Sequence, residues 1–426
     1  MEKVAIIGTG IAGMSAAYKL HGRAHLTLFE RENYIGGHTN TVSVEHAGEV
    51  VAMDTGFMVY NEVTYPNLIA LFEELDVPTK QTDMSFGVNH VPSGIAYCGS
   101  NLNQLFAQRS NALRPDFWRM IRQILRFNRE ATALLDQPGA EQKTLREFLQ
   151  EGRYSRAFSD YYLLPMTGAI WSTPPDAMLE FPALTLIRFL RNHGLLGVNT
   201  HFQWRTVEGG SRAYRERLIA PFRDRFHLRR PARAVEVRER GASVFDGEGN
   251  REDFDHVVIA THADEALALR VNPTEREVGL LRHFHYEPNR VTLHTDERVM
   301  PATRRAWAAW NYRVDPRKDG AASPSTHYWM NALQGVSERH NYFVSVNDPG
   351  IARPGTILWE KTYDHPLFDA ATQKAQKDLP SLNAGGPVYY AGSYFRYGFH
   401  EDALMAGLDA AAALLRNTGK RELLVV

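Results

Sequence analysis

Val4-Ala-Ile-Ile7-Gly8-Thr-Gly10-Ile-Ala-Gly13 is the stretch of sequence that decides the fold of this chain. Its first part, Val4 to Ile7, is wholly apolar, as expected for a strand buried on both faces of a parallel sheet. Met14 to Leu20 then has the pattern of a helix, and Leu26 to Glu30 is a second apolar strand that ends in an acid. The sequence therefore predicts a strand–turn–helix–strand unit of the kind that binds dinucleotides.

The glycines of this turn have separate roles in such a unit. Gly8 allows the tight turn, Gly10 lets the backbone approach a pyrophosphate, and Gly13 lets the helix pack closely on the strand. The free N–H groups and the dipole of the helix N-terminus then favour the negative charge of the phosphates. The predicted dinucleotide contacts of this unit are Gly8, Gly10, Ile11, Ala12, Gly13 and, for a ribose hydroxyl, Glu30.

The composition narrows the class of protein. With 426 residues, 44% of them hydrophobic and 23% charged, the chain is long enough for two interlocked globular domains. A net charge of −1 gives no general attraction to nucleic acid. The single cysteine, Cys98, excludes an internal disulfide and a cysteine-built zinc site, and no metal is expected. Because the sequence lacks a signal-peptide pattern and a membrane-spanning apolar run, the expected location is the cytoplasm.

Beyond the opening unit, the chain alternates between two kinds of sequence. Residues 61–204 are rich in helical patterns and aromatics, and residues 269–385 mix short strands with aromatic-rich loops. Residues 205–268 hold short strands with the hairpin turn Asp246-Gly-Glu-Gly-Asn250, and residues 386–426 hold a strand and an alanine-rich helix. We therefore predict a mixed α/β fold. A Rossmann-like nucleotide domain would be assembled from 1–60, 205–268 and 386–426, with a substrate domain of mixed sheet and helices, 61–204 and 269–385, inserted between these segments.

Further motifs indicate which dinucleotide binds. Glu30 is followed by Arg31-Glu-Asn-Tyr-Ile-Gly36-Gly37-His38, and Asp54-Thr-Gly56, Val257-Val-Ile-Ala-Thr261 and Tyr390-Ala-Gly392-Ser393 come later. The last of these continues into Gly398-Phe-His-Glu-Asp-Ala-Leu-Met-Ala-Gly407. In this order and at these places, the motifs resemble those of the amine oxidase and carotenoid desaturase superfamily of FAD enzymes.

The resemblance implies FAD as the cofactor, bound along all of these motifs. The implied contacts are Arg31, Gly36, Gly37, His38, Asp54, Gly56, Phe57, Val235 (for the adenine), Ala260, Gly392, Ser393, Glu401, Asp402 and Ala403. Ser393 departs from the acidic residue that is common at its position in the superfamily. Cys98 is far from the C-terminal motif, so non-covalent binding is expected. A second G-x-G-x-x-G for NADPH is absent, which leaves the electron acceptor open.

Other phrases resemble a narrower subfamily of bacterial amine-oxidase-like flavoproteins. They are Met53–Glu62, Ala169–Ser172, Phe189–Leu196, Thr206–Ser211 and Tyr363–Pro366. Members are similar to the flavin domain that plants fuse to cyclopropane-fatty-acid synthases, and bacterial members are linked to methylated, diene and furan fatty acids. The resemblance implies a lipid-like substrate, namely a methylated acyl chain on a phospholipid, and a partner methyltransferase.

Such a substrate suits flavin chemistry. A C–H bond next to a double bond is a better hydride donor than an alkane C–H, because the developing cation is shared over several carbons. The bond must lie about 3–3.5 Å from the accepting flavin atom in a dry pocket. Candidate linings of an apolar tunnel are Trp171, Trp307, Trp310, Tyr312, Tyr328, Trp329, Met330 and Tyr394, and each of them could equally be a core residue.

Several residues are candidates for proton transfer at the flavin. His365 is the first choice, with Asp364 as its orienting partner, and His193 and His400 also fall in family-like phrases. Amine oxidases of the superfamily often place a lysine near flavin N5 through a water, and Lys361 matches that position loosely. Each histidine could instead be structural and bond a backbone carbonyl.

The segment 117–135 has the pattern of a basic amphipathic helix. Arg119, Arg122, Arg126 and Arg129 gather on one side of a helical wheel, opposite Phe117, Met120, Ile121, Ile124, Leu125, Phe127 and Leu134. Such a helix can lie on an anionic membrane, which would make the protein peripheral at the inner face. The alternative is a helix docked on the core with solvated arginines.

Two other functions stay open. A flavin amine oxidase acting on a polyamine needs acidic residues and an aromatic cage for the cation, and an arginine-rich entrance would oppose it. A non-catalytic, flavin-binding partner of a lipid methyltransferase is the other possibility. Reduction of the flavin by methylated lipid, by spermine or by neither separates the three functions.

Overall fold

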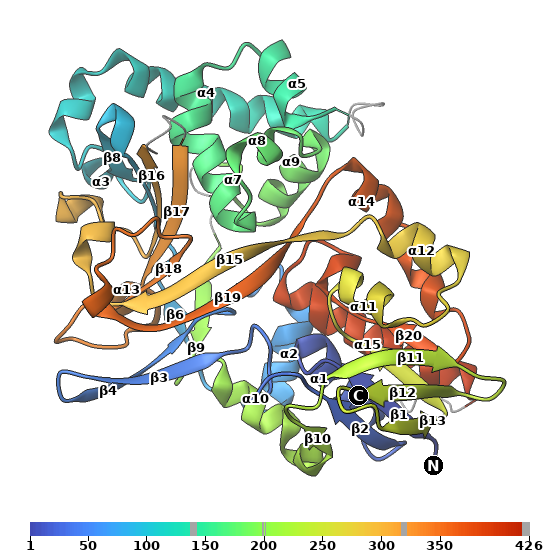
Figure 1. Cartoon of the computed structure of the whole chain (residues 1–426). Coiled ribbons are helices and arrows are strands. Elements are labelled where there is room, and N and C mark those ends of the chain that lie inside the picture. The colour runs from blue at the N-terminus through green and yellow to red at the C-terminus, as the bar shows by residue number, and fades with distance from the viewer. Residues whose placement is uncertain (137–142, 198–199, 201, 317–321, 420–426) are drawn as a thin grey trace.

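The computed structural model describes residues 1–136, 143–197, 200, 202–316 and 322–419. Figure 1 shows a small parallel sheet at one end of the molecule, near the N-terminus, and a group of helices at the opposite end. Long strands of a second sheet run between the two ends. This arrangement confirms the predicted mixed α/β class.

A five-stranded parallel sheet with strand order β10-β2-β1-β14-β20 supports the predicted dinucleotide turn. The strands are β1 (Lys3–Ile7), β2 (His25–Phe29), β10 (Phe226–His227), β14 (His256–Ile259) and β20 (Val388–Tyr390). They come from distant stretches of the chain. Val257, for example, pairs with Ala5 on one side and with Val388 on the other.

Alternate residues of β1 face separate cores. Val4 and Ile6 pack against the helices α1 (Ile11–Leu20) and α15 (His400–Asn417). Ala5 and Ile7 face a three-stranded antiparallel sheet made of β11 (Ala232–Val237), β12 (Ala242–Asp246) and β13 (Arg251–Phe254). Because both faces are buried, the strand has to be apolar throughout. The hairpin predicted at residues 246–250 joins β12 and β13.

Helices α1 and α15 pack unusually closely. A Cβ added at Gly407 would lie 2.1 Å from the carbonyl oxygen of Ala12, so only glycine fits there. At the same contact the Ser15 hydroxyl donates to the carbonyl oxygen of Leu404 at 3.1 Å. The close contact fixes α15, which carries the C-terminal motif, against α1, which follows the glycine turn.

A seven-stranded mixed sheet, in the order β19-β15-β18-β17-β16-β7-β8, makes up the larger part of the remainder. Its strands are β7 (Phe86–His90), β8 (Ile95–Cys98), β15 (His285–His294), β16 (Trp310–Pro316), β17 (Ala322–Trp329), β18 (Phe343–Val346) and β19 (Ile357–Leu367). β7 and β16 are parallel, and the other neighbours are antiparallel. β15 and β19 extend side by side towards the parallel sheet (Figure 1).

Helices from residues 102–192 cover one end of this sheet (Figure 1). They are α3 (Leu102–Leu105), α4 (Pro115–Leu134), α5 (Leu145–Glu151), α6 (Arg156–Phe158), α7 (Leu164–Trp171), α8 (Pro175–Leu179) and α9 (Ala183–Asn192). The other elements are the strands β3 (Thr41–His46), β4 (Glu49–Asp54), β5 (Tyr60–Asn61), β6 (Thr79–Thr82) and β9 (Trp204–Val207), with the helices α2 (Pro66–Glu74), α10 (Arg212–Ile219), α11 (Ala263–Leu269), α12 (Glu275–Leu281), α13 (Met330–Gln334) and α14 (Ala370–Gln376).

The helix α4 differs in detail from the helical-wheel prediction. Phe127 is buried, as predicted, but Leu125 is exposed on the same side as Arg122. Arg126 is turned inward, where its guanidinium bonds Glu130 at 2.9 Å and lies over the ring of Tyr154. The prediction placed the apolar residues, including Leu125, on the arc opposite the arginines, whereas the exposed face of α4 carries both Leu125 and arginines.

Among the described residues, no helix combines the length and the apolar character that crossing a bilayer requires. The same part of the chain holds no cluster of three metal-ligating side chains.

Candidate active site

The predicted glycine turn has the geometry of a phosphate cradle. Gly8 has a φ of +97°, and a Cβ there would meet the carbonyl oxygen of Ala260 at 2.6 Å. A Cβ at Gly13 would lie 2.0 Å from the carbonyl oxygen of Gly8, which explains the packing role of this glycine. In the described part of the chain, no atom outside the neighbouring residues lies within 4 Å of the Cβ position at Gly10, and no side chain caps the N-terminus of α1. The first N–H groups of α1 therefore face open space, as an anion site requires.

Glu30 ends β2 beside this turn, and its carboxylate is buried and fixed. It accepts hydrogen bonds from the backbone N–H of Thr9 at 3.1 Å and of Glu32 at 2.9 Å, and from the Thr9 hydroxyl. A carboxylate accepts further bonds through its remaining lone pairs. A ribose hydroxyl that lies beside the phosphate cradle can donate to it.

A second turn closes over the first. Gly36 bridges to Gly10, and the N–H of Phe57 donates to the carbonyl oxygen of His38 at 2.8 Å. A Cβ at Gly56 would lie 2.3 Å from that same oxygen, so the close approach needs glycine.

The C-terminal motif supplies an unsatisfied polar group. Tyr394 is fully buried, its hydroxyl has no hydrogen-bond partner among the described residues, and its side chain lines the same space as Gly392. Because the hydroxyl itself is buried away from the cavity, a bound molecule does not reach it. The open cradle at Gly10 and the fixed carboxylate of Glu30 make the residues present suitable for a flavin dinucleotide.

One cavity of about 1770 Å³ joins these motifs. Its volume exceeds the roughly 300–1,000 Å³ of a typical small-molecule site, so it has room for the dinucleotide and for a second molecule. The residues predicted to bind the cofactor or transfer protons that line it are Gly8, Gly10, Ile11, Ala12, Glu30, Arg31, Gly36, Gly37, His38, Gly56, Phe57, His193, Ala260, Lys361, Asp364, His365, Gly392, Ser393, His400 and Ala403.

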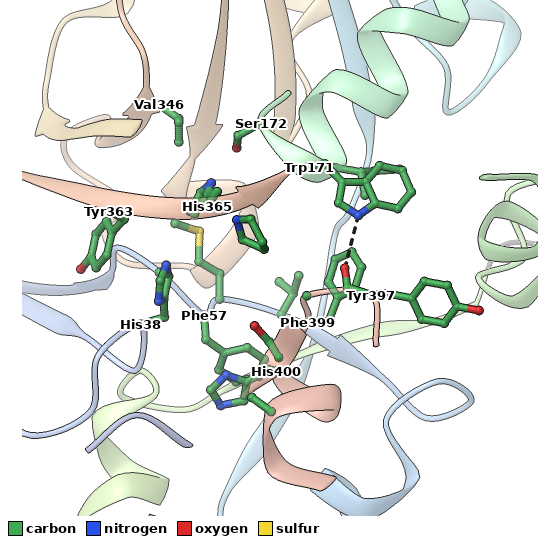
Figure 2. Close-up of a pocket in the computed structure, with 18 of the residues that line it drawn as sticks. His38, Phe57, Trp171, Ser172, Val346, Tyr363, His365, Tyr397, Phe399 and His400 are labelled. Carbon is green, nitrogen blue, oxygen red and sulfur yellow. Dashed lines mark hydrogen bonds between the residues drawn. The ribbon is translucent and has the colours of Figure 1, made fainter. Parts of the chain in front are cut away.

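Three histidines lie around the middle of the cavity, as Figure 2 shows. The rings of His38 and His365 are 5.5 Å apart, and His400 stacks on Phe57 at 3.8 Å. The Nε2 atom of His400 is 2.6 Å from the hydroxyl of Tyr214. Burial lowers the pKa of His365 to about 4 and that of His400 to about 3, and it holds the pKa of His38 well below its ordinary value. All three imidazoles are therefore neutral near pH 7.

The other predicted catalytic residues lie differently from what was expected. The ammonium of Lys361 pairs with Glu32 at 3.1 Å and lies over the ring of Tyr34, on the dinucleotide side of the cavity. Asp364 alternates with its neighbours on β19, so its side chain points away from the face of His365. No hydrogen bond in the described part of the chain joins the two side chains, which corrects the orienting role predicted for Asp364.

The structure also corrects the cofactor contact predicted for Asp54. Its carboxylate is buried and accepts from Thr41 at 2.6 Å, from the hydroxyl of Ser211 at 2.7 Å and from Gln334 at 2.7 Å. These bonds join three distant segments, and Asp54 does not line the cavity. The neighbours Thr55, Gly56 and Phe57 line it instead.

The acids of the C-terminal motif are likewise structural. Glu401 accepts from the N–H groups of Asn67 and Leu68, each at 2.9 Å, and so caps α2. Asp402 accepts from the N–H of Phe399 at 2.9 Å and caps its own helix. Burial raises the pKa of Asp402 to about 6. Neither residue lines the cavity.

Val235 is the last cofactor contact that the structure corrects. Its carbonyl oxygen accepts from the guanidinium of Arg270 at 2.9 Å and from the N–H of Val271 at 3.1 Å. Ala232 and Arg233, earlier on the same strand, line the cavity where Val235 does not.

Half of the residues predicted to line an apolar tunnel do line the cavity, and the other half are core residues. Trp171, Trp310, Tyr328 and Tyr394 line the cavity, whereas Trp307, Tyr312, Trp329 and Met330 pack in cores of the second sheet. Further lining residues were not predicted, among them Tyr162, Met166, Ile170, Phe189, Tyr397 and Phe399. The helical spacing of Met166 and Ile170, which puts both on one side of α7, was the available signal.

A Rossmann-like sheet, glycine turns that meet over one cavity, and space for a second molecule beside the dinucleotide define a flavin-dependent oxidoreductase. Residues 11–358 match the family described as flavin containing amine oxidoreductase. The chain belongs to this family, and FAD is its cofactor. Cys98, in β8, does not line the cavity.

Solved structures share the fold. Putrescine oxidase bound to putrescine is 16% identical with a TM-score of 0.69, over 97% of this chain and 99% of the other. Cyclohexylamine oxidase from Brevibacterium oxydans IH-35A is 19% identical with a TM-score of 0.69, over 98% and 99%. A CLA-producing fatty acid isomerase from P. acnes is 14% identical with a TM-score of 0.66, over 96% and 98%. None of the curated proteins compared with the chain matches it.

Proposed function

We propose that this protein dehydrogenates an unsaturated, methyl-branched fatty acyl chain carried on a phospholipid, and that the product is a conjugated diene. The methyl branch and the phospholipid come from the subfamily that the sequence resembles. The lining of the cavity supports the acyl chain itself.

The observation that carries this proposal is the chemistry of the cavity beyond the histidines. Tyr162 and the α7 residues Met166, Ile170 and Trp171 line it there, and Phe399 closes it near His400. The Trp171 indole N–H donates to the carbonyl oxygen of Tyr397 at 3.3 Å, which leaves the ring face apolar (Figure 2). An apolar, aromatic channel favours a hydrocarbon chain because it offers burial without hydrogen-bonding groups that must be satisfied.

The carboxylates of the cavity do not suit a polyamine. Glu30, Glu32 and Glu265 lie at its dinucleotide end. Asp364 also lines the cavity, but it is half-buried on β19 next to His365. Asp83 is exposed and accepts from both the N–H and the hydroxyl of Ser85, each at 2.8 Å. Among the described residues, therefore, no buried carboxylate stands at the aromatic end to pair with an ammonium group. An ammonium taken into such a channel without a partner is costly.

FAD bound in the cavity supplies the acceptor for a hydride from the substrate. The allylic C–H bond breaks with both electrons leaving on the hydride, and the substrate then loses a proton from the neighbouring carbon as the second double bond forms. His365 is neutral and lies on the cavity wall, so its imidazole can take that proton. The channel aligns the chain and excludes water, which keeps the cationic substrate from being hydrated.

The structural neighbours support both the proposal and its main rival. The fatty acid isomerase shows that an enzyme of this fold acts on a fatty acid, and two other neighbours are oxidases of amines.

An anaerobic single-turnover assay tests the proposal. The purified yellow protein is mixed with a methyl-branched unsaturated phospholipid, with its saturated counterpart, or with spermine, and the visible flavin absorbance is followed. We expect bleaching by the unsaturated lipid alone, with a product that has lost one pair of hydrogens by mass spectrometry. Bleaching by spermine would establish the amine oxidase instead. A flavin that no lipid and no amine reduces would favour the non-catalytic partner of a methyltransferase.

A further inference from the structure

An exposed apolar and basic surface lies on α3, α4 and the turn between them. Its apolar members are Leu113, which is 87% exposed, Leu102 (75%), Leu125 (54%) and Trp118 (45%). Large apolar side chains this exposed are unusual when they gather on one surface of a soluble protein. We call these residues, together with Arg119, Arg122 and Arg129, the docking face.

The indole ring of Trp118, in the docking face, is held in place along one edge of the ring. Its indole N–H donates to the carbonyl oxygen of Ala112 at 2.8 Å, and its ring lies 5.3 Å from that of Phe106. Because the polar atom is satisfied, the rest of the ring is free to enter an apolar phase. One stripe of α4 carries apolar and cationic side chains in alternation. At helical spacing, these are Trp118, Arg122, Leu125 and Arg129.

The charge of this surface is one-sided. Residues 102–134 contain six arginines and two acids. Both acids are engaged within the protein, Asp116 by Arg114 and Glu130 by Arg126 and Tyr154. None of the three arginines of the docking face forms an ion pair with a described residue, so their charge is available to an anionic partner.

Two residues of the docking face lie at an opening of the active-site cavity. Leu102 and Leu125 are exposed at the surface and also line the cavity, as do Gly99, Ser100 and Asn101. Leu105, Ile121 and Ile124 continue the apolar lining inward. A hydrocarbon chain that enters between Leu102 and Leu125 would pass these apolar side chains on its way to the aromatic channel.

We propose that the docking face seats this protein on an anionic phospholipid bilayer and that acyl chains pass from the bilayer into the cavity between Leu102 and Leu125. This inference rests on the proposed function for its purpose, but the binding itself does not depend on it. Tryptophan and leucine enter the interface while arginines pair with lipid phosphates, and the opposite end, with the parallel sheet, stays away from the membrane (Figure 1).

Cosedimentation with vesicles tests the docking face. The holoenzyme is mixed with vesicles of phosphatidylcholine alone or with added phosphatidylglycerol. We expect binding to the anionic vesicles, weakened by salt. Replacing Arg119, Arg122 and Arg129 together by glutamine should lower the partition coefficient on the order of 100-fold, since each arginine near an anionic surface contributes roughly fivefold. Leu113→Gln with Leu125→Gln should weaken the remaining binding several-fold.

A matched control removes the same charge elsewhere. Arg240, Arg276 and Arg282 are exposed, form no ion pair with a described residue, and lie on the hairpin β11–β12 and on α12, far from α4 in Figure 1. Replacing these three by glutamine should leave vesicle binding within about twofold. Equal losses in both triple variants, or no binding to anionic vesicles, would overturn the inference.

Two further outcomes decide between neighbouring explanations. Self-association that Leu113→Gln and Leu125→Gln abolish, without vesicle binding, would show that a second copy of the chain covers this face. If the protein oxidises dispersed acyl chains but ignores vesicles, the docking inference fails and the proposed function stands. If it binds vesicles but no acyl chain reduces its flavin, the proposed function fails and the docking face stands.

Discussion

Replacing Gly10 by alanine separates cofactor binding from folding. Gly10 has φ of −62° and ψ of 177°, which alanine adopts without strain, and its Cβ position is free of protein atoms to 4 Å. Alanine is a poorer N-cap than glycine but restricts the unfolded chain, and these opposing effects leave the apoprotein within about 0.5 kcal/mol of the wild type. The added methyl group projects into the space that the pyrophosphate has to enter.

The expected loss therefore appears only with FAD present. A steric conflict that weakens binding tenfold corresponds to about 1.4 kcal/mol. At an FAD concentration of 100 times the wild-type Kd, the cofactor stabilises the wild type by about 2.7 kcal/mol, and it would stabilise such a variant by about 1.4 kcal/mol. Urea unfolding with and without FAD measures this difference, and quenching of flavin fluorescence gives the Kd directly.

The neighbouring glycine provides the control. A Cβ at Gly13 would lie 2.0 Å from the carbonyl oxygen of Gly8, so Gly13→Ala should destabilise the apoprotein itself by about 2 kcal/mol or more. A Gly10→Ala protein that binds FAD with the wild-type Kd would refute the idea that the backbone at this turn approaches the diphosphate.

Four other outcomes are expected. Glu401→Gln should lower the free energy of unfolding by about 1–3 kcal/mol, because the side chain caps α2, and leave the FAD Kd unchanged; a weaker Kd with normal stability would return Glu401 to the cofactor site. Tyr394→Phe removes a buried hydroxyl that has no partner among the described residues, so it should leave the FAD Kd within about twofold in fluorescence titrations and should not lower the free energy of unfolding; a clearly weaker Kd would show that the hydroxyl reaches the cofactor. His365→Asn should slow the appearance of the conjugated diene, followed by its ultraviolet absorbance in stopped-flow experiments, by about 100-fold or more while FAD stays bound, and an unchanged rate would exclude His365 as the base. The pKa of His365 is about 4 in the folded protein and about 6.5 in the unfolded chain. The unfolded chain therefore binds a proton first as the pH falls from about 6.5 to about 4, and the free energy of unfolding should decrease by up to about 3 kcal/mol over this range. Urea unfolding should show a smaller pH dependence in His365→Asn.

Features that depend on neighbouring residues along the chain were predictable from the sequence. The apolar run of β1, the glycine turn and the hairpin at 246–250 each need only local sterics, and the structure confirms the sheet and the hairpin. The cofactor also followed from the sequence, because its motifs fix the turns that contact it.

Side-chain direction could not be predicted in the same way. Asp54 and Glu401 lie in flavin motifs, but their carboxylates turn to Ser211 and Asn67, whose positions only the tertiary fold determines. The exposure of Leu125 could not be predicted for a similar reason, because a helical wheel does not show which neighbours cover an apolar side chain. The channel combines residues from several helices, and only the spacing of Met166 and Ile170 gave a local sign of it.

The order of the parallel strands has a consequence for biosynthesis. The strand β14 pairs with β1 on one side, but its other edge stays open until the ribosome has added Val388 and its neighbours. Until then the nascent chain exposes an unpaired, apolar strand edge, which is prone to aggregation. The site for FAD is therefore complete only after α15 has packed against Ala12, late in synthesis. An adequate supply of FAD should raise the yield of native enzyme rather than speed the early steps of folding.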